Sequence, residues 1–498
     1  MSAAVDLRTA ERQHPDLTAE YLEHQKLLPI AAAEGRLRVA TWVEAPDEQA
    51  LDDLAMLFSM PIVLVQVPEA DARAAIRRVY SGDVLSEADL AESAAVTEQN
   101  ERDPALDDLV SLANEAPVVK LVNLILLEAV EARASDIHIE HETSGLRVRY
   151  RVDGVLQDQA VPPAHLRAAV VSRLKIMAEL DIAERRVPQD GRIQLRLRDR
   201  QVDVRVSTLP ALHGESVVLR LLDKESGRID LAGIGMDPEV LAAFERVIAR
   251  PHGIVLATGP TGSGKTTTLY AAIDRIRTGR EKILTVEDPV EYELTGVPQV
   301  QVNERVGLTF ASALRALLRQ DPDVMLVGEI RDRETADIAT HAALTGHLVL
   351  STLHTNDAVT ALTRLVDLGI PPYLVCSTVE AVLAQRLVRR ICERCAEPVR
   401  STPAELASLE LPPDSRLDGR KGRGCAHCRG TGYRGRTGIY ELLMIDDRVR
   451  DALQQERSAR ALAHVAADAG MRTLRADGVR QVAAGITTIE EVLRVTRG

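Results

Sequence analysis

Four short apolar stretches follow one another between residues 253 and 353, and polar residues end each of them. In order they read GIVLATG, KILTVED, DVMLVGE and HLVLSTL, with helical spacing between one stretch and the next. Strands that alternate with helices in this way predict a mostly parallel sheet covered by helices, an α/β fold. Because catalytic groups on such sheets gather at the carboxyl ends of the strands, the polar residues after each stretch are candidates for a site.

The preceding segment, residues 108–228, has a different pattern. APVVKLVNLILLEAVE and LRAAVVSRLKIMAELDIAE have the apolar spacing of helices, and SDIHIE begins a strand. LRVRYRVDGVLQDQ alternates apolar and polar residues around Asp153-Gly154, which predicts a hairpin. RIQLRLRDR and QVDVRVSTL predict a second strand pair. The pattern indicates an α+β domain, followed by a short turn-rich joint.

The two ends of the chain are organised differently again. Residues 1–80 predict a small α/β module, with a strand in LFSMPIVLVQV and a helix in VPEADARAAIRRVY. Residues 81–107 combine low hydropathy with mutually repelling acids, so we expect a flexible acidic linker. The α/β core is expected over 236–498. After residue 370 its pattern predicts helices, interrupted by a cysteine-bearing subdomain at 392–428.

Charge is distributed unevenly along the chain. The net charge is −13, and residues 1–107 carry −12 of it, so the remainder is close to neutral. Aromatic residues make up only 2% of the chain. A near-neutral core with few rings for base stacking argues against a general nucleic-acid binder. Because no apolar run reaches 18 residues and the N-terminus lacks a signal-peptide pattern, we expect a cytoplasmic protein.

A glycine-rich loop follows the first apolar stretch and precedes a helical pattern, TTTLYAAIDRIRT. This context between a strand and a helix is the one that a phosphate-binding loop requires. Its backbone N–H groups would surround a phosphate, Lys265 would reach the β- and γ-phosphates, and Thr266 would place its hydroxyl on Mg²⁺. The residues expected to hold ATP are Gly259, Pro260, Thr261, Gly262, Ser263, Gly264, Lys265, Thr266 and Thr267.

Hydrolysis needs further groups, and two acids stand at strand ends. Glu287 lies in TVEDPVEY and Glu329 in LVGEIRD. We assign Glu329 to the magnesium ion or its water shell and Glu287 to the general base, although the sequence allows the two roles to be exchanged. The alternative is a pair of ordinary solvated acids.

Histidine and arginine supply the remaining candidates for the nucleotide site. His354 follows the fourth apolar stretch, where its side chain would meet the γ-phosphate. Arg192 and Arg205, in the α+β domain, are candidates for phosphate contacts, as are Arg315 and Arg319 on one face of a predicted helix. For each of these residues the alternative is a structural or solvated side chain, and for Arg315 and Arg319 a contact with a neighbouring subunit is a further one.

Four of the five cysteines form two CxxC pairs, Cys392 with Cys395 and Cys425 with Cys428. In a cytosolic chain this spacing favours a tetrahedral four-thiolate zinc site over disulfides, with free buried thiols as the alternative. From Cys392 to Cys428 six bases balance six acids, so the segment is a poor clamp for a polyanion. The fifth cysteine, Cys376, lies in an apolar segment and is expected to be buried.

Five boxes in order carry a family resemblance: RVPQDGRI, GPTGSGKTTTLY, TVEDPVEY, RQDPDVMLVGEIRD and TGHLVLSTLHTNDA. Over 108–498 the chain resembles the type II/type IV secretion ATPase superfamily. It is most similar to the type II secretion ATPases (general secretion pathway protein E), and next to the type IV pilus assembly ATPases. The resemblance implies a RecA-like P-loop NTPase core, a PAS-like α+β domain before it, a small N-terminal α/β domain and a zinc-binding subdomain.

The resemblance also implies a function and a set of partners. A homohexamer on the cytoplasmic face of the inner membrane would hydrolyse ATP to drive pseudopilus assembly and protein export across the outer membrane. The boxes of Glu287 and Glu329 would be catalytic, that of His354 would sense the nucleotide, and Arg192 and Arg205 would face its phosphates. Residues 1–80 would dock on the cytoplasmic domain of secretion protein L, and the zinc subdomain would face the membrane platform, protein F. The alternatives are a type IV pilus assembly ATPase and a nucleic-acid translocase.

Overall fold

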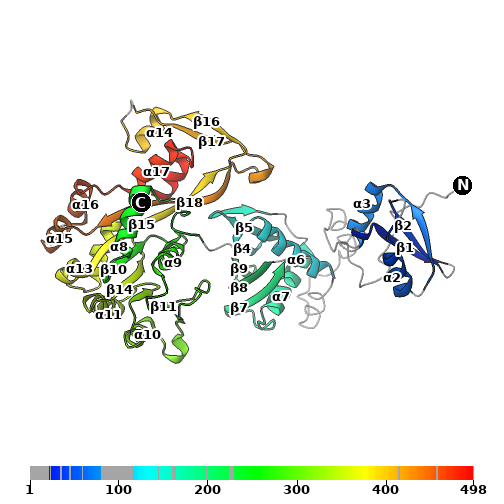
Figure 1. Cartoon of the computed structure of the whole chain (residues 1–498), viewed down its shortest axis with the longest axis horizontal. Coiled ribbons are helices and arrows are strands. Elements are labelled where there is room, and N and C mark those ends of the chain that lie inside the picture. Colours follow the sequence, from blue (N-terminus) through cyan, green and yellow to red (C-terminus); the bar gives the residue numbers. More distant parts are fainter. Residues whose placement is uncertain are drawn as a thin grey trace.

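The computed structural model describes residues 22–79 and 116–496, apart from 23, 34–35, 44–45, 59, 144, 160–163, 198–199, 224–228, 413–414 and 456–457. They form an N-terminal module, a middle α+β domain and a larger α/β core, in chain order (Figure 1). The expected acidic linker, 81–107, lies outside the described residues. Within the described ranges no helix combines the length and the hydropathy needed to cross a bilayer.

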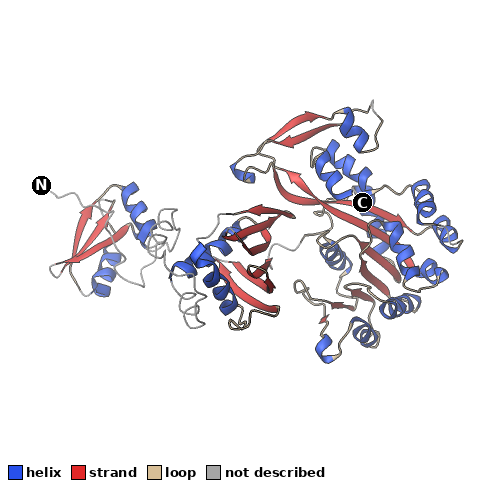
Figure 2. Cartoon of the chain, turned by 180° about the vertical axis from the view of Figure 1, so that it is seen from behind, coloured by secondary structure: helices blue, strands red, loops and turns tan. Residues whose placement is uncertain are grey.

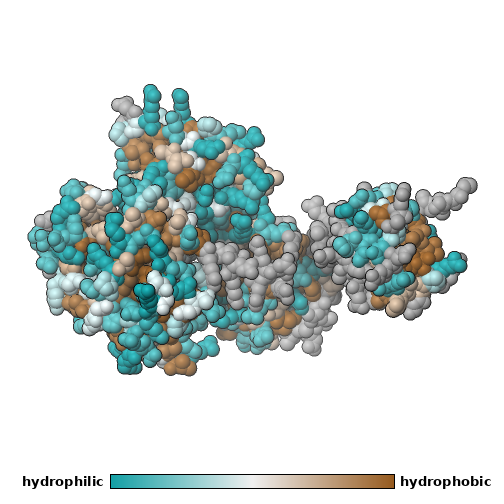
Figure 3. Space-filling model, viewed as in Figure 1, coloured by the Kyte–Doolittle hydropathy of each residue, from teal (hydrophilic) through white to brown (hydrophobic). Residues whose placement is uncertain are grey.

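The N-terminal module is a three-stranded sheet with two helices. Strand β1 pairs with β2 antiparallel, and β2 pairs with β3 parallel. The predicted strand and helix are both present, as β3 and α3, and β1 and β2 are two further strands that the sequence pattern does not predict. Hydrophobic residues lie on the surface of this module (Figure 3), and its exposed large hydrophobic side chains are Met56, Leu57 and Leu64. The elements are β1 Leu27–Ala33, β2 Arg36–Thr41, α2 Glu48–Phe58, β3 Ile62–Gln66 and α3 Glu69–Val79.

The middle domain is a six-stranded antiparallel sheet in the order β6-β5-β4-β9-β8-β7, packed against two helices. Both predicted hairpins and both predicted helices are present. Asp153 and Gly154 connect β5 to β6 with φ angles of 49° and 84°, the left-handed pair that a tight hairpin turn requires. The elements are α6 Ala116–Glu131, β4 Ala134–Glu142, β5 Gly145–Val152, β6 Val155–Asp158, η2 Ala164–Leu166, α7 Arg167–Met177, β7 Gln189–Leu197, β8 Arg200–Ala211 and β9 Gly214–Asp223.

The core is built on a seven-stranded sheet in the order β12-β11-β13-β14-β10-β15-β18. Neighbouring strands are parallel except for β18, which runs antiparallel to β15. The four predicted strands are β10, β11, β13 and β14, and they lie side by side, which confirms the α/β fold class. The strands are β10 Gly253–Thr258, β11 Ile283–Glu287, β12 Gln299–Gln301, β13 Val324–Val327, β14 Leu348–Leu353, β15 Val379–Ile391 and β18 Tyr433–Met444.

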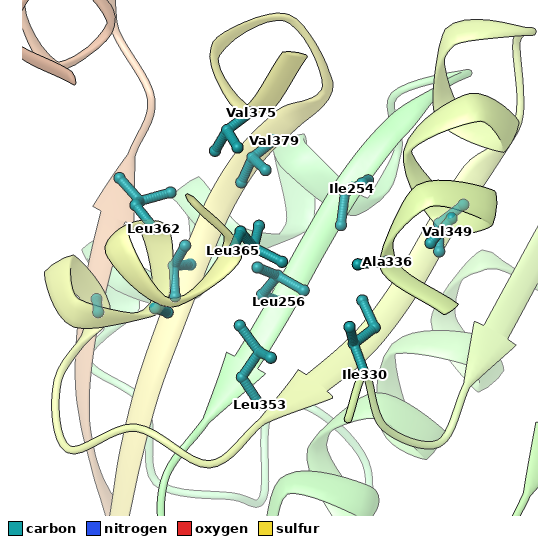
Figure 4. Packing of buried hydrophobic residues seen from close by; sticks show 14 of the residues in the cluster. Ile254, Leu256, Ile330, Ala336, Val349, Leu353, Leu362, Leu365, Val375 and Val379 are labelled. Atoms are coloured by element: carbon teal, nitrogen blue, oxygen red, sulfur yellow. The ribbon is translucent and has the colours of Figure 1, made fainter. Parts of the chain in front are cut away.

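Helices cover both faces of this sheet (Figure 2). On one face, side chains from β10 and β14 pack against α11, α12 and α13 (Figure 4). Each fully buried Leu, Ile or Val there contributes about 1.5–3 kcal/mol relative to an exposed one. The helices are α8 Pro238–Ile248, α9 Lys265–Ile276, η3 Glu304–Val306, α10 Phe310–Leu317, α11 Arg333–Leu344, α12 Ala358–Asp367, α13 Pro372–Thr378, α15 Asp447–Gln454, α16 Ala459–Asp468, α17 Leu474–Ala483 and α18 Ile489–Thr496.

The expectation that the chain is helical on both sides of the cysteine region is wrong at two places. Residues 379–391 and 433–444 form β15 and β18, which pair over most of their length. Residues 379–386 of β15 are all buried, so no polar alternation marks the strand, and its apolar spacing also fits a helix. Between the two strands lie β16 Ala396–Arg400, α14 Pro403–Ser408, β17 Asp418–Gly422 and η4 Ala426–Cys428.

Candidate functional site

The predicted phosphate loop connects β10 to α9 at the carboxyl edge of the sheet. Gly259, Gly262 and Gly264 have φ angles of 147°, 77° and 91°, which other residues adopt only with strain. A Cβ on Gly259 would also lie 2.6 Å from the carbonyl oxygen of Gln385. Gly264 is the N-cap of α9 and provides no side-chain cap, so the first N–H groups of the helix are left for an anion.

Lys265 begins α9 and folds back over the loop. Its Nζ donates to the carbonyl oxygens of Gly259 at 2.7 Å and Pro260 at 3.2 Å. Burial lowers the pKa of Lys265 to about 8, against the effect of Glu329 and with that of Arg386. A phosphate would restore the charge that burial disfavours. Thr266 and Thr267 are half-buried in the same first turn of the helix.

Glu329 and His354 lie beside this lysine. Glu329 follows β13 and His354 follows β14, and His354 Nε2 is 3.4 Å from Glu329 Oε2. Arg331 Nη2 lies 2.5 Å from the other carboxylate oxygen of Glu329. Burial lowers the pKa of His354, as does the charge of Lys265, so its imidazole is neutral at neutral pH. The structure therefore brings together three of the predicted residues, Lys265, Glu329 and His354.

Glu287 occupies a different environment at the end of β11. Its side chain is 3% exposed and accepts hydrogen bonds from three neighbours. Tyr270 of α9 donates to Oε2, and Thr285 Oγ1 and Gln299 Nε2 donate to Oε1 at 2.6 and 3.1 Å. The carboxylate thus joins α9, β11 and β12. Its role as general base stays a prediction, while Glu329 is the carboxylate that lies beside Lys265.

None of the four predicted arginines lies on the phosphate loop: two are on strands of the α+β domain, and two are on α10 or just after it. Arg192 and Arg205 are directly opposite each other on β7 and β8, and Arg205 Nη2 donates to the carbonyl oxygen of Val290 at 3.4 Å. Arg205 thus reaches the core just beyond β11, and burial lowers its pKa. Arg315 is exposed on α10 and pairs with Glu334 at 2.6 Å, and Arg319 donates to the carbonyl oxygen of Arg315 at 2.9 Å.

Two residues of the loop environment were missed from the sequence, Gln385 and Arg386 of β15. Gln385 Nε2 donates to the carbonyl oxygen of Ser263 at 2.8 Å, and Arg386 Nη2 donates to that of Asn356 at 2.8 Å. Gln385 Oε1 and Ser263 Oγ are buried and find no hydrogen-bond partner among the described residues, which fits a polar ligand in the loop. An apolar stretch that ends in polar residues, VEAVLAQR, was the available signal.

The two CxxC pairs converge where β15 and β18 leave the sheet. The four sulfurs lie within 4.8 Å of one another, with separations of 3.9 Å for Cys392–Cys425, 3.8 Å for Cys395–Cys428 and 3.7 Å for Cys425–Cys428. Tetrahedral zinc with bonds of about 2.3 Å needs sulfurs about 3.8 Å apart, so the residues fit this ion.

The thiols of the cluster differ in their surroundings. Burial opposes ionisation of the Cys428 thiol, but N–H groups of Cys425 and Gly432 donate to its sulfur and lower its pKa. Burial raises the pKa of the Cys395 thiol in the same cluster. Because thiolate is the form that binds metal, the geometry of the four sulfurs is the observation that fits zinc. Cys376 is buried and lies outside the cluster, as expected.

A phosphate loop between a buried strand and a helix, with a carboxylate and a histidine at the ends of the neighbouring strands, defines a P-loop nucleoside triphosphatase. Within that class the family can be stated. The family model described as Type II/IV secretion system protein matches residues 111–494, and the chain belongs to this family of ATP-hydrolysing enzymes. A second model, the MshEN domain, matches residues 3–84.

Curated relatives are similar in sequence to this chain over most of its length. Type II secretion system protein E of Klebsiella pneumoniae is 47% identical, covering 98% of both chains. Type II secretion system protein HxcR of Pseudomonas aeruginosa is 55% identical over 79% of this chain and 80% of its own. Type II secretion system ATPase E of Vibrio cholerae is 47% identical over 94% and 96%. These relatives confirm the predicted resemblance to the type II secretion ATPases.

Among solved structures, the pilus retraction motor PilT with bound ADP is similar to this chain. Its TM-score is 0.52 at 27% identity, and the match covers 75% of this chain and 96% of that one. The likeness confirms the RecA-like fold class.

Proposed function

We propose that this chain is the ATPase motor of a type II secretion system, hydrolysing ATP to drive pseudopilus assembly and protein export across the outer membrane. The observation that carries the proposal is the convergence of Lys265, Glu329 and His354 beside the phosphate loop, in a chain of the secretion ATPase family. Arg205 of the α+β domain contacts the core at Val290. If hydrolysis changes this contact, the two domains move relative to each other, and that movement is the motor function we propose.

Each side chain then has a role in the reaction. Lys265 binds the β- and γ-phosphates, and Thr266 offers its hydroxyl to Mg²⁺, which supplies positive charge to the phosphate oxygens. We exchange the roles first given to the two glutamates. Glu329 orients the attacking water and accepts its proton, and Glu287 holds α9 and β12 in place through Tyr270 and Gln299.

Neutral His354 donates to the γ-phosphate and responds to its departure. Arg192 and Arg205 approach the phosphates when the α+β domain closes on the core. Both roles require the nucleotide to lie between the two domains, as the family resemblance implies.

The proposal extends to assembly and location. We propose a homohexamer held on the cytoplasmic face of the inner membrane, with residues 1–80 docked on the cytoplasmic domain of secretion protein L and the zinc subdomain presented to platform protein F. Met56 and Leu57 of α2 and Leu64 of β3 are exposed large apolar side chains of the N-terminal module, and they are the first candidates for a contact with a partner. The sulfur spacings support a structural zinc ion in the subdomain.

A hydrolysis assay tests the proposal against the nucleic-acid translocase. The purified chain is assayed alone, with single- or double-stranded DNA, and with acidic phospholipid vesicles plus the cytoplasmic domain of protein L. We expect stimulation by the vesicles and protein L, none by DNA, and no hydrolysis by Lys265→Ala in any arm. Stimulation by DNA without stimulation by the membrane components would overturn the proposal.

A capture experiment separates secretion from pilus assembly. The full chain is used as bait against detergent-solubilised inner membrane, beside a chain shortened to begin at residue 108. We expect protein L to be retained by the full chain only. Retention of a pilus-assembly membrane protein in its place would favour the type IV pilus alternative.

A further inference from the structure

Strand β15 passes the phosphate loop at a point where two consecutive polar side chains are buried. Gln385 is 1% exposed and Arg386 8% exposed, and both follow the last pairing of β15 with β10, Thr258 with Ala384. Gln385 fastens the phosphate loop through its hydrogen bond to the carbonyl oxygen of Ser263, two residues before Lys265. The backbone of the loop is therefore tied to β15 at a defined position.

Arg386 fastens a second loop from the same place. Its Nη2 donates to the carbonyl oxygen of Asn356 at 2.8 Å and lies 3.3 Å from Asn356 Oδ1, while Nη1 donates to the carbonyl oxygen of Gln385 at 3.1 Å. Asn356 lies two residues after His354. The start of the same loop is held by Thr258, whose hydroxyl is 2.7 Å from that of Thr355.

The charge of Arg386 is not used in an ion pair within the described part of the chain. The carboxylates whose fields reach it are Glu441 and Asp357. Both are occupied at helix N-termini: Asp357 accepts from Thr360 N at 2.7 Å, and Glu441 accepts from Ala358 N at 2.8 Å and from Leu474 N at 3.2 Å. Burying a guanidinium without a paired carboxylate destabilises the folded protein. An uncharged side chain in the same place would make the structural contacts without that loss of stability.

We propose that Arg386 is a positioning residue for ATP hydrolysis, which sets the place of His354 relative to the phosphate loop by holding Asn356 while Gln385 holds Ser263. The inference rests on the proposed function and adds to it a residue that acts through another. A planar guanidinium suits this task, because its two terminal nitrogens bond two carbonyl oxygens in a fixed fork, whereas the donors of a lysine all lie on one nitrogen and rotate freely.

The test separates turnover from binding. Arg386→Lys keeps the charge and loses the fork, so we expect kcat to fall about 10–100-fold, as for misplaced catalytic groups, while the dissociation constant for ATP stays within about threefold of the parent value. Nucleotide binding is measured by fluorescence titration and turnover by phosphate release, each with the melting temperature of the same preparation.

A double-mutant cycle asks whether Arg386 acts through His354. If it does, Arg386→Lys has little further effect on kcat in a His354→Ala background, and the two changes are not additive. Arg389→Lys is the matched control. Arg389 lies three residues along the same strand, pairs with Glu491 at 2.7 Å and stacks on Tyr433, so its replacement should lower the melting temperature without coupling to His354.

Three results would overturn the inference: a parent-level kcat for Arg386→Lys, a rise in the dissociation constant that matches the fall in kcat, or additivity with His354→Ala. If Arg386→Lys fails to fold, Asn356→Ala leaves the arginine in place and should show the same split between turnover and binding to a smaller degree. The ATPase activity of the parent tests the proposed function separately. A parent without ATPase activity would contradict that function. An active parent with an equally active Arg386→Lys variant would contradict only the inference about Arg386.

Discussion

Two glutamates that look alike in the sequence have opposite surroundings in the fold. Both end a buried strand, but Glu287 accepts three hydrogen bonds from side chains of α9, β11 and β12, while Glu329 lies beside His354 and Arg331. Sequence position at a strand end predicts the edge of the sheet and not the direction of the side chain. The distinction depends on Tyr270 and Gln299, which are 17 and 12 residues from Glu287 in the chain.

This contrast predicts different effects for two isosteric changes. Glu329→Gln should bind ATP and lose turnover by about 10²–10⁴-fold, the usual contribution of a positioned base, with an unchanged melting temperature. Glu287→Gln should destabilise the core by about 1–3 kcal/mol, because an amide leaves one buried donor unmatched. Phosphate release and thermal unfolding measured on both variants decide the matter. A stable, inactive Glu287→Gln beside an active Glu329→Gln would restore the first assignment.

The pKa of Lys265, lowered to about 8 by burial, predicts how nucleotide binding depends on pH. Bound phosphate favours the ammonium form, so binding above pH 8 takes up a proton and affinity falls as pH rises. We expect a loss of roughly 25-fold between pH 7.5 and 9.5, and little change for Lys265→Arg, which keeps its charge. Without nucleotide, folding stability depends on pH in the opposite direction from nucleotide affinity. Between pH 8 and 10.5 the unfolded chain binds a proton that the folded chain lacks, so the contribution of Lys265 to stability rises with pH. Calorimetric titrations in buffers of different ionisation enthalpy measure the proton uptake.

Among the elements of the core sheet, the antiparallel ribbon formed by β15 and β18 is the part that the sequence pattern did not predict. The sequence predicts the four inner strands because each is a short apolar run with a turn after it. Residues 379–386 are buried on both faces and continue into VRRI, whose spacing resembles a helix. The phosphate loop and the cysteine pairs were predictable because their chemistry fixes the spacing of their residues. Gln385 and Arg386 were not, since their roles arise only when β15 lies beside β10.

The cysteine cluster closes the far end of this ribbon, and its metal content is testable. Cys425→Ser should lose the zinc ion, one equivalent per chain, and loosen residues 392–432, because a four-thiolate site contributes folding energy directly. Cys376→Ser is the matched control, since Cys376 lies outside the cluster and should leave the zinc content intact. Elemental analysis and limited proteolysis of both variants provide the measurements. Full zinc retention by Cys425→Ser, or a parent without zinc, would contradict the assignment.

In the whole molecule, the α+β domain and the core meet at more than one place, and two of their contacts are polar contacts made by described side chains. Arg205 of β8 reaches Val290, and Asp153, at the β5–β6 turn, accepts from Gly435 N at 2.8 Å and lies 3.5 Å from Arg436. The second contact falls just after the cysteine cluster, at the start of β18. A cavity of about 70 Å³ lies beside it, lined by residues of both domains including Arg133, Asp153 and Arg434. These contacts join the α+β domain to the core at the residues after β11 and at the start of β18.

Removing the Asp153 contact should free one side of this domain. Asp153→Gly removes the carboxylate and keeps the left-handed turn. It should speed hydrogen exchange at the amides of residues 433–436 and leave zinc content unchanged, because the zinc site does not include Asp153. Asp158→Ala is the control: Asp158 pairs with Arg147 on the exposed neighbouring strands, and its loss should alter exchange only there. Equal exchange at Gly435 in Asp153→Gly and the parent would show that the turn does not hold the two domains together.

The contact between Gln385 and Ser263 also orders events during synthesis. The two residues are 122 positions apart, so at about 5–20 residues per second the phosphate loop leaves the ribosome on the order of ten seconds before the strand that fastens it. Nascent chains that end before residue 385 contain every residue of the phosphate loop and lack its support. The phosphate loop therefore gains its hydrogen bond to β15 only after most of the chain has been translated.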